Sequence, residues 1–173
     1  MEVAPQLIRE LINQYAIRDN LRPEIIACVI IQESAGNTFA NRFEPGFFQA
    51  HLSGKKRNEL AGWKPSPGDI PNLATELNNR STSWGLMQVM GDTARWCAKV
   101  TNPYLTSLCD PDQGISAGCR VLSYYLAKNN NDYFKALTCY NAGYPNSPIG
   151  KEYAKSINDR FNRKEHLRYL KDA

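Results

Sequence analysis

Residues 23–34 read PEIIACVIIQES, and this stretch decides the fold. Proline is favoured at the first position of a helix, and Glu24 places a negative charge in the first turn, where the helix dipole stabilises it. The apolar run from Ile25 to Ile31 predicts a helix that is buried on most sides, although such a run is also compatible with a buried strand. We therefore expect a buried helix that carries the carboxyl group of Glu33 at its end.

Apolar residues recur at helical spacing in several other segments, so the predicted fold class is mainly α. Residues 5–17 read as an amphipathic helix. Asp110 is the expected N-cap of a longer helix, with Gln113 as its capping-box partner. Asp92 is expected to cap a short helix that runs to Trp96. Further helices are expected at about 73–78, 132–140 and 150–163, and at most a small β-hairpin near 84–89.

Residues 38–82 have a different composition, with prolines and glycines at Pro45, Gly46, Gly54, Gly62, Pro65, Pro67, Gly68 and Pro71. Long irregular segments in compact domains are usually lids or binding loops. We interpret this segment as a loop-rich insertion over one side of a cleft, and a mobile insertion without a role is the alternative. The whole chain, residues 1–173, is expected to form one domain.

The formal net charge of +4 is modest. It suits an anionic partner such as a cell wall or a lipid surface, but it is too weak to predict nucleic-acid binding, and no nucleic-acid-binding motif supports that class. The longest apolar run is far shorter than the roughly 20 residues that span a bilayer. The chain also begins without the basic and apolar segments of a secretory signal peptide.

Five cysteines stand at Cys28, Cys97, Cys109, Cys119 and Cys139. Their odd number leaves at least one thiol that cannot pair within the chain, and none of them forms a Cys-x-x-Cys metal or redox motif. We expect them to be buried apolar thiols, with one disulfide among the last four as the alternative. No metal and no cofactor are expected.

Three short segments together indicate carbohydrate chemistry. Breaking a glycosidic bond requires a carboxyl group that keeps its proton near neutral pH, and both burial and a helix C-terminus favour the protonated form of Glu33. The turn at 85–88 offers the amide of Gln88 to an N-acetyl sugar. The segment at 140–143 places the hydroxyl of Tyr140 where it can orient Glu33. Each segment also has a purely structural interpretation. Glu33 could be a surface glutamate at a helix end, residues 85–88 could be an ordinary turn with a core methionine, and Tyr140 could be a core tyrosine.

In this order, the segments ESAGN at 33–37, GLMQV at 85–89 and YNAG at 140–143 resemble the signature segments of the soluble lytic transglycosylase family, which is related in fold to goose-type lysozyme. The resemblance spans residues 20–160 and implies a lysozyme-like fold. It also implies residue roles: Glu33 as the catalytic acid and base, Met87 and Gln88 lining the sugar subsites, and Tyr140 and Asn141 flanking the acid. The chain departs from the family pattern at Thr38 and Gly91, where proline is common.

Two further segments, RFEPGF at 42–47 and STSW at 81–84, resemble a branch common among bacteriophage cell-wall enzymes. This likeness implies that the protein acts on the bacterial cell wall in the periplasm. It also implies that the protein reaches the wall during phage lysis or is carried there by the virion. It adds Ser83 and Trp84 to the expected substrate-binding residues. Trp84, Phe47 and Phe48 are expected either to stack on sugar faces or to pack internally.

The resemblance implies cleavage of the MurNAc-β-1,4-GlcNAc bond of peptidoglycan by transglycosylation, which forms a 1,6-anhydro-muramoyl end and consumes no water. Two alternatives remain open. A muramidase would need a second carboxylate to activate water. Glu44 is the candidate, although it also suits a structural pair with Arg42, and Asp92 is the weaker choice. The chain could instead be a non-catalytic wall-binding or virion structural module.

The C-terminal region is rich in basic residues, and we expect it to hold a monomeric enzyme on an anionic envelope through a basic C-terminal helix. Acidic residues interleave with these cations, so a solvated helix face is the alternative. The basic residues are Lys151, Lys155, Arg160, Arg163, Lys164, Arg168 and Lys171.

Overall fold

The computed structural model describes residues 4–63 and 72–171. The prolines and the glycine predicted at 65–71 to belong to an irregular loop lie outside these residues. The fold is mainly helical with one small antiparallel sheet, as predicted. Its principal helices are α1 (Pro5–Asp19), α2 (Pro23–Ser34), α4 (Leu73–Arg80), α5 (Gly91–Trp96), α6 (Pro111–Lys128), α7 (Tyr133–Ala142), α8 (Pro148–Asn162) and α9 (Leu167–Leu170).

The PEIIACVIIQES stretch is helix α2, so the alternative of a buried strand is wrong. Every residue from Ile25 to Ile30 is buried, as expected for a helix without a polar face. The helix ends because Ala35 adopts the left-handed conformation, with φ at 52°, and its N–H donates to the Ile31 carbonyl at 3.2 Å. Glu33 consequently lies in the last turn of a buried helix.

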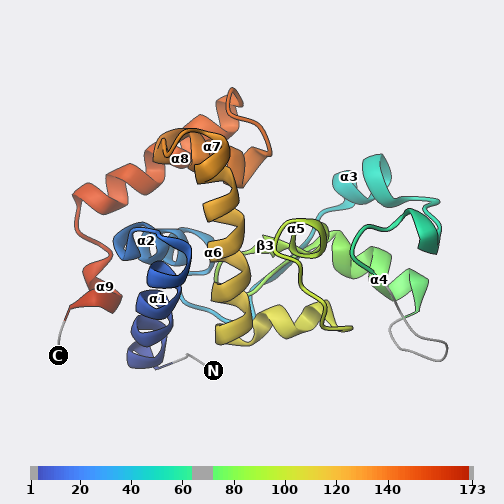
Figure 1. The fold of residues 1–173 in the computed structure, drawn as a ribbon, viewed down its shortest axis with the longest axis horizontal. Helices are drawn as coiled ribbons and strands as arrows, with labels where there is room; N and C mark the ends of the chain where they lie inside the picture. Colours follow the sequence, from blue (N-terminus) through green and yellow to red (C-terminus); the bar gives the residue numbers. More distant parts are fainter. Residues whose placement is uncertain (1–3, 64–71, 172–173) are drawn as a thin grey trace.

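Helix α6 is the centre of the fold (Figure 1). Helices α1 and α2 lie on one side of it, the antiparallel pair α7 and α8 lies across one end, and α9 packs beside α1 and α2. The main apolar core fills the space between these helices and includes Ile12, Ile26, Leu122 and Ile157. Among the described residues, no helix has the length and apolar character needed to cross a membrane.

The sheet has three strands rather than the single hairpin predicted from the sequence. Strand β1 (Asn41–Phe43) pairs with β2 (Thr82–Trp84), which pairs with β3 (Val89–Met90), and both pairings are antiparallel. The predicted hairpin is formed by β2 and β3. Strand β1 comes from the proline- and glycine-rich segment, where weak periodicity gave no signal for a strand of three residues.

The segment between β1 and β2 contains a second apolar core of its own. It includes α3 (Pro45–Phe47), a π-helix (Phe48–Leu52), a 3-10 helix (Arg57–Glu59) and α4, which extends the helix predicted at 73–78. Leu52, Leu60 and Trp63 are buried against each other, with Phe47 and Phe48 packed beside them. We call the described residues of this region, 45–63 and 72–80, the cleft-side lobe. In Figure 1 it projects away from the α1–α2 side of the molecule.

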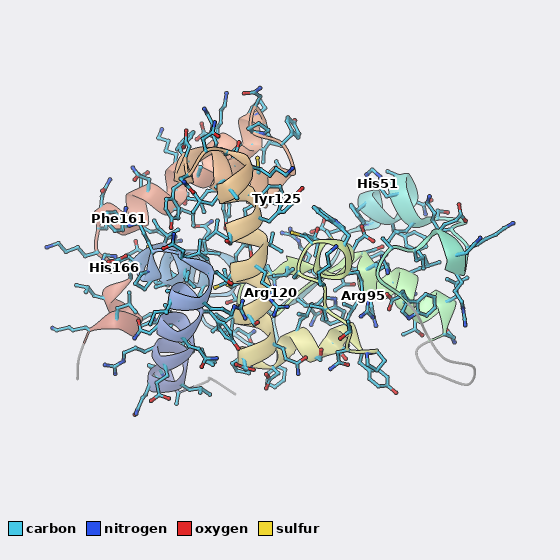
Figure 2. All side chains as sticks on the ribbon, in the orientation of Figure 1. His51, Arg95, Arg120, Tyr125, Phe161 and His166 are labelled. Carbon is cyan, nitrogen blue, oxygen red and sulfur yellow. The ribbon has the colours of Figure 1, made fainter. Side chains whose placement is uncertain are left out.

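A buried ionic cluster joins this lobe to α5. The Glu76 carboxylate accepts hydrogen bonds from Arg80 at 2.9 Å and from Arg95 at 2.8 and 2.9 Å, and all three side chains are at most 1% exposed. Figure 2 shows Arg95 on the side of α5 toward α4. Asp92 accepts from Arg80 at 2.7 Å. The prediction that Asp92 caps its helix is wrong, since it lies within the first turn and serves this cluster instead.

The other predicted local features have mixed outcomes. Asp110 does cap α6, accepting from the Gln113 N–H at 3.1 Å, but the Gln113 side chain accepts from Asn102 at 3.3 Å rather than completing a capping box.

All five cysteines are free thiols, and Cys28, Cys119 and Cys139 are buried. The predicted basic C-terminal helix is divided, because α8 ends at Asn162 and α9 begins at Leu167.

Candidate active site

A cleft of about 280 Å³ lies between the main helical body and the cleft-side lobe. Its lining brings together segments that are far apart in the sequence: the end of α2, strand β1, the β2–β3 turn, one face each of α5 and α6, and the end of α7. The described lining residues are Glu33, Arg42, Glu44, Phe47, Ser83, Gln88, Val89, Met90, Thr93, Val121, Tyr140 and Asn141.

Glu33 lies in this cleft with its carboxyl group held from the side of α8. The hydroxyl of Tyr153 donates a hydrogen bond to Glu33 Oε1 at 2.5 Å. Tyr153 is itself only 9% exposed, so the hydroxyl is fixed by packing. On the preceding residue, Gln32 Oε1 accepts from Ser156 at 3.0 Å and from Arg160 at 2.7 Å. Helix α8 therefore anchors the last turn of α2 at two adjacent positions.

The environment of Glu33 favours the protonated form of its carboxyl group. Burial away from water raises the pKa of this carboxyl from 4.5 to about 7, against the opposing effects of the Tyr153 hydrogen bond and the Arg42 charge, which both lower it. The negative end of the α2 dipole lies at the same place and acts in the same direction as burial. A carboxyl group with a pKa near 7 can deliver a proton at neutral pH and accept one afterwards.

Tyr140 and Asn141 line the cleft, but Tyr140 does not hold Glu33. Its hydroxyl donates to the Met87 carbonyl at 2.8 Å, so this side chain fixes the β2–β3 turn against α7. The role that we expected for the Tyr140 hydroxyl is filled by Tyr153. Burial is the main cause that raises the pKa of the Tyr140 phenol, and the charge of Glu33 raises it further, so Tyr140 lies close to the acid. Asn141 is exposed at the cleft wall.

The β2–β3 turn presents Gln88 to the cleft in a strained conformation, with φ at 45°. Its Nε2 donates to the Ala40 carbonyl at 2.8 Å and to the Gly85 carbonyl at 2.9 Å. The side-chain amide thus holds the turn against the segment that leads into β1, instead of leaving both donors for a sugar. Gly85 makes the turn possible, because its φ is 70° and a Cβ would lie 2.1 Å from the Leu108 carbonyl oxygen.

Two of the expected substrate-binding residues are in the core. Met87 is fully buried and does not line the cleft, and its sulfur packs so closely on α6 that a Cβ on Gly118 would lie 2.4 Å away. Trp84 is 9% exposed, and its indole N–H donates to the Asn79 carbonyl at 2.9 Å. Its position corrects the expectation that Trp84 stacks on a sugar. Ser83 and Phe47 do line the cleft.

Glu44 faces the same cleft from the position between β1 and the cleft-side lobe. Its carboxylate forms an ion pair with the Arg42 guanidinium, which is the structural partnership that the sequence left open. The Arg42 side chain is 75% exposed, so this pair is solvated and Glu44 remains accessible at the cleft wall. Asp92, the weaker candidate, is committed to Arg80.

The two departures from the family pattern have structural reasons. Thr38 is 4% exposed, and its hydroxyl donates to the Cys109 carbonyl, which ties the segment after α2 to the 3-10 helix Leu105–Cys109. Gly91 begins α5 at a place where a Cβ would lie 2.2 Å from the Asn79 carbonyl oxygen. Both substitutions support the loops around the cleft and leave Glu33 in place.

Sequence reasoning missed Tyr153, Thr93 and Val121. Tyr153 lies on the buried face of α8 with Ala154 and Ile157, a pattern that predicts core packing and gives no signal for a contact with a residue 120 positions away. Among the described residues, no group of three or more histidine, cysteine, aspartate or glutamate side chains is arranged to hold a metal ion.

The sequence profile of the Transglycosylase SLT domain matches residues 10–161. This match covers most of the chain and includes all three signature segments. Comparisons with curated proteins and with solved structures gave no match. The chain therefore belongs to the transglycosylase SLT domain family, and its activity class is peptidoglycan degradation of the lytic transglycosylase type.

Proposed function

We propose that this family member is a peptidoglycan lytic transglycosylase that cleaves the MurNAc-β-1,4-GlcNAc bond and leaves a 1,6-anhydro-muramoyl end. One observation carries the proposal: Glu33 lines the cleft with its pKa raised to about 7 and its Oε1 held by Tyr153. A module that only binds the wall has no use for such a proton donor. Family membership supports the same conclusion.

In the first step Glu33 acts as the general acid. Its proton passes to the glycosidic oxygen as the bond from that oxygen to the anomeric carbon breaks, so the leaving sugar departs as a neutral alcohol. Positive charge then develops on the muramoyl ring. The acetamido oxygen of the same sugar shields this charge. The Tyr153 hydrogen bond stabilises the carboxylate that Glu33 has become.

In the second step Glu33 acts as the general base. The 6-hydroxyl of the muramoyl sugar attacks its own anomeric carbon, and its proton passes to the Glu33 carboxylate. A new bond between O6 and C1 replaces the glycosidic bond, and the enzyme returns to its starting protonation state. Since no water enters, one enzyme carboxyl suffices for the whole cycle.

The other lining residues hold the strand. Asn141 offers a side-chain amide and Ser83 a hydroxyl to the cleft. Gln88 also lines the cleft, and its Nε2 donates to the Ala40 and Gly85 carbonyls, which leaves the side-chain oxygen as the acceptor for the sugar. Tyr140 keeps that turn in place through its bond to the Met87 carbonyl. Small shifts of these groups would misplace the scissile bond relative to Glu33, and positioning of this kind accounts for a large share of enzymatic rate enhancement.

A muramidase that hydrolyses the same bond is the alternative, and the place of Glu44 in the cleft favours it. In that reaction Glu44 would activate water on the face of the sugar opposite Glu33. The ion pair with Arg42 argues against a free base at this position. We retain transglycosylation as the proposed reaction.

Clearing of purified cell walls by two matched variants tests the assignment. Glu33→Gln keeps the shape of the side chain but has no acidic proton to give, and we expect its clearing rate to fall by about a hundredfold to ten-thousandfold. Glu44→Gln is expected to lose less than about tenfold, whereas a hydrolase that needs this base would lose about a hundredfold or more. A Glu33→Gln variant that still clears walls at a rate near that of wild type would overturn the proposal.

The setting in which the enzyme works is also proposed. The segments at 42–47 and 81–84 that resemble the bacteriophage branch form strands β1 and β2 and one wall of the cleft. We infer a phage-type enzyme that reaches the cell wall during lysis or from the virion. The exposed lysines Lys151, Lys155 and Lys164 of the C-terminal region are proposed to hold it on the anionic envelope.

A further inference from the structure

An aromatic cluster lies on the surface where α5 meets α6. The rings of Trp96 and Tyr124 meet edge to face with centroids 5.4 Å apart, and Tyr124 meets Tyr125 in the same manner at 5.3 Å. Edge-to-face contacts hold rings in fixed orientations. Tyr124 is 38% exposed, and Trp96 and Tyr125 are half-buried. We call these three residues the aromatic platform.

The platform lies one helical turn beyond two residues that line the cleft. Thr93 of α5 and Val121 of α6 line the cleft. Residues three or four positions apart are neighbours on one face of a helix, so Trp96 follows Thr93, and the two tyrosines follow Val121, by one turn or about 5.4 Å. Figure 2 shows Tyr125 on the upper half of α6, below the α7–α8 pair, and the end of α7 also lines the cleft.

The exposure of Trp96 distinguishes it from the other tryptophans of the chain. Trp63 and Trp84 are 7% and 9% exposed and belong to the two apolar cores. Trp96 belongs to neither core, although its neighbours in α5 include the fully buried Ala94. Large aromatic rings at a solvated helix junction beside a cleft are typical of ligand contacts, since they combine an apolar face with a polar N–H or O–H.

We propose that Trp96 and Tyr124 form an additional sugar subsite, which binds a further ring of the N-acetylated β-1,4 glycan strand beyond the residues held in the cleft. The apolar face of a pyranose ring would pack on the indole of Trp96 and beside Tyr124, over whose ring the Lys128 ammonium lies 5.8 Å from the centroid. The indole N–H and the phenol O–H would form hydrogen bonds with the hydroxyl and acetamido groups of the sugar. Tyr125 fixes the orientation of Tyr124. This inference rests on the proposed function, because the occupant is the same strand that Glu33 cleaves.

The subsite makes binding dependent on strand length. A strand long enough to reach the platform gains the stacking contact, whereas a fragment that fills only the cleft does not. Contacts between two aromatic rings are worth about three- to tenfold in affinity, and we expect a gain of the same order for the apolar face of a sugar ring on these side chains. The stacking contact stabilises the bound substrate and the transition state equally. It therefore changes KM and leaves kcat nearly constant.

Tryptophan fluorescence tests the contact directly. In a Glu33→Gln background, which prevents cleavage, titration with chitohexaose, a β-1,4 oligomer of N-acetylglucosamine, is expected to give a saturable change in emission. Trp96→Phe in the same background should remove most of that change, because the two remaining tryptophans are buried. An equal emission change without Trp96 would overturn the proposal. Chitobiose, which is too short to occupy cleft and platform together, serves as the control ligand.

Kinetics on soluble uncross-linked glycan strands provide the second test. Tyr124→Ala is expected to raise KM about three- to tenfold on long strands, with kcat within about twofold of wild type and no change on the shortest cleaved fragments. Tyr104→Ala is the matched control, since Tyr104 is 48% exposed in the loop before α6 and does not line the cleft. A KM effect of the same size on short and long strands, or none on either, would refute the subsite.

The two proposals fail in distinguishable ways. Wild-type protein that binds chitohexaose but cleaves no wall would contradict the proposed function and leave the platform standing. Wild-type protein that cleaves walls, with Trp96→Phe and Tyr124→Ala variants that bind and cleave long strands normally, would contradict the platform alone.

Discussion

Replacing Glu33 with glutamine is expected to abolish activity and to stabilise the fold, and the stabilisation should depend on pH. The carboxyl is buried in the last turn of α2, where its pKa is raised from 4.5 to about 7. The folded protein therefore binds this proton more tightly than the unfolded chain does. The unfolded state loses the proton first as pH rises, so ionisation of Glu33 opposes folding.

The size of the effect follows from the pKa. A tenfold change in proton affinity corresponds to about 1.4 kcal/mol, so the interval from 4.5 to about 7 corresponds to about 3 kcal/mol. Below about pH 4 both states keep the proton, and wild type and Glu33→Gln should be nearly equal in stability. Between about pH 4.5 and 7 wild type should lose stability relative to the variant, and above about pH 7.5 the difference should be complete.

Urea unfolding of both proteins at about pH 4, 6 and 8 measures the difference in the free energy of unfolding. The comparison cancels every other titrating group that the two proteins share. Glu10→Gln, which removes an exposed carboxyl on α1, is the control for a general loss of negative charge. A difference between wild type and Glu33→Gln that is the same at all three pH values would refute the claim that burial perturbs this carboxyl.

Three other changes test separate contacts. Tyr153→Phe removes a hydrogen bond that lowers the Glu33 pKa, so the basic limb of the pH–rate profile should move to higher pH and turnover should drop about ten- to a hundredfold; an unmoved limb contradicts the contact. Glu76→Gln leaves two buried guanidinium groups without their carboxylate and should cost about 3–5 kcal/mol in urea unfolding, whereas a loss under about 1 kcal/mol would show that the cluster is dispensable. Reversing Lys155 and Lys164 to glutamate should weaken sedimentation with cell walls at low salt while sparing cleavage of short glycans, and equal wall binding would rule out the envelope contact.

Local signals predicted most of the helices. The apolar run of α2 and the cap at Asp110 each act through residues close in sequence, so their consequences could be predicted from the chain alone. Strand β1 could not be predicted, because three exposed residues acquire their structure only by pairing with β2. The ionic cluster around Glu76 could be predicted only in part, since Arg80 lies four residues away on the same helix but Arg95 comes from α5.

The residues of the candidate site also fall into those that could be predicted from local sequence and those that depend on tertiary contacts. The position of Glu33 at a buried helix end could be predicted, because the apolar residues that precede it in the sequence form that helix. Met87 and Trp84 were assigned to the substrate because they stand in signature segments, yet the structure uses them to pack the turn against α6 and to bond the Asn79 carbonyl. Tyr153 and the aromatic platform depend on how helices meet, and no local pattern in the sequence records such contacts.

The mass of the released muramoyl ends tests the central claim most directly. Purified peptidoglycan digested with wild-type protein, with Glu33→Gln as the blank, should give fragments that end in 1,6-anhydro-muramic acid and are lighter than the hydrolytic products by one water. Digestion in water enriched with heavy oxygen should leave those ends unlabelled, because the intramolecular 6-hydroxyl is the nucleophile. Reducing ends that carry the heavy oxygen would contradict transglycosylation and identify the enzyme as a hydrolase.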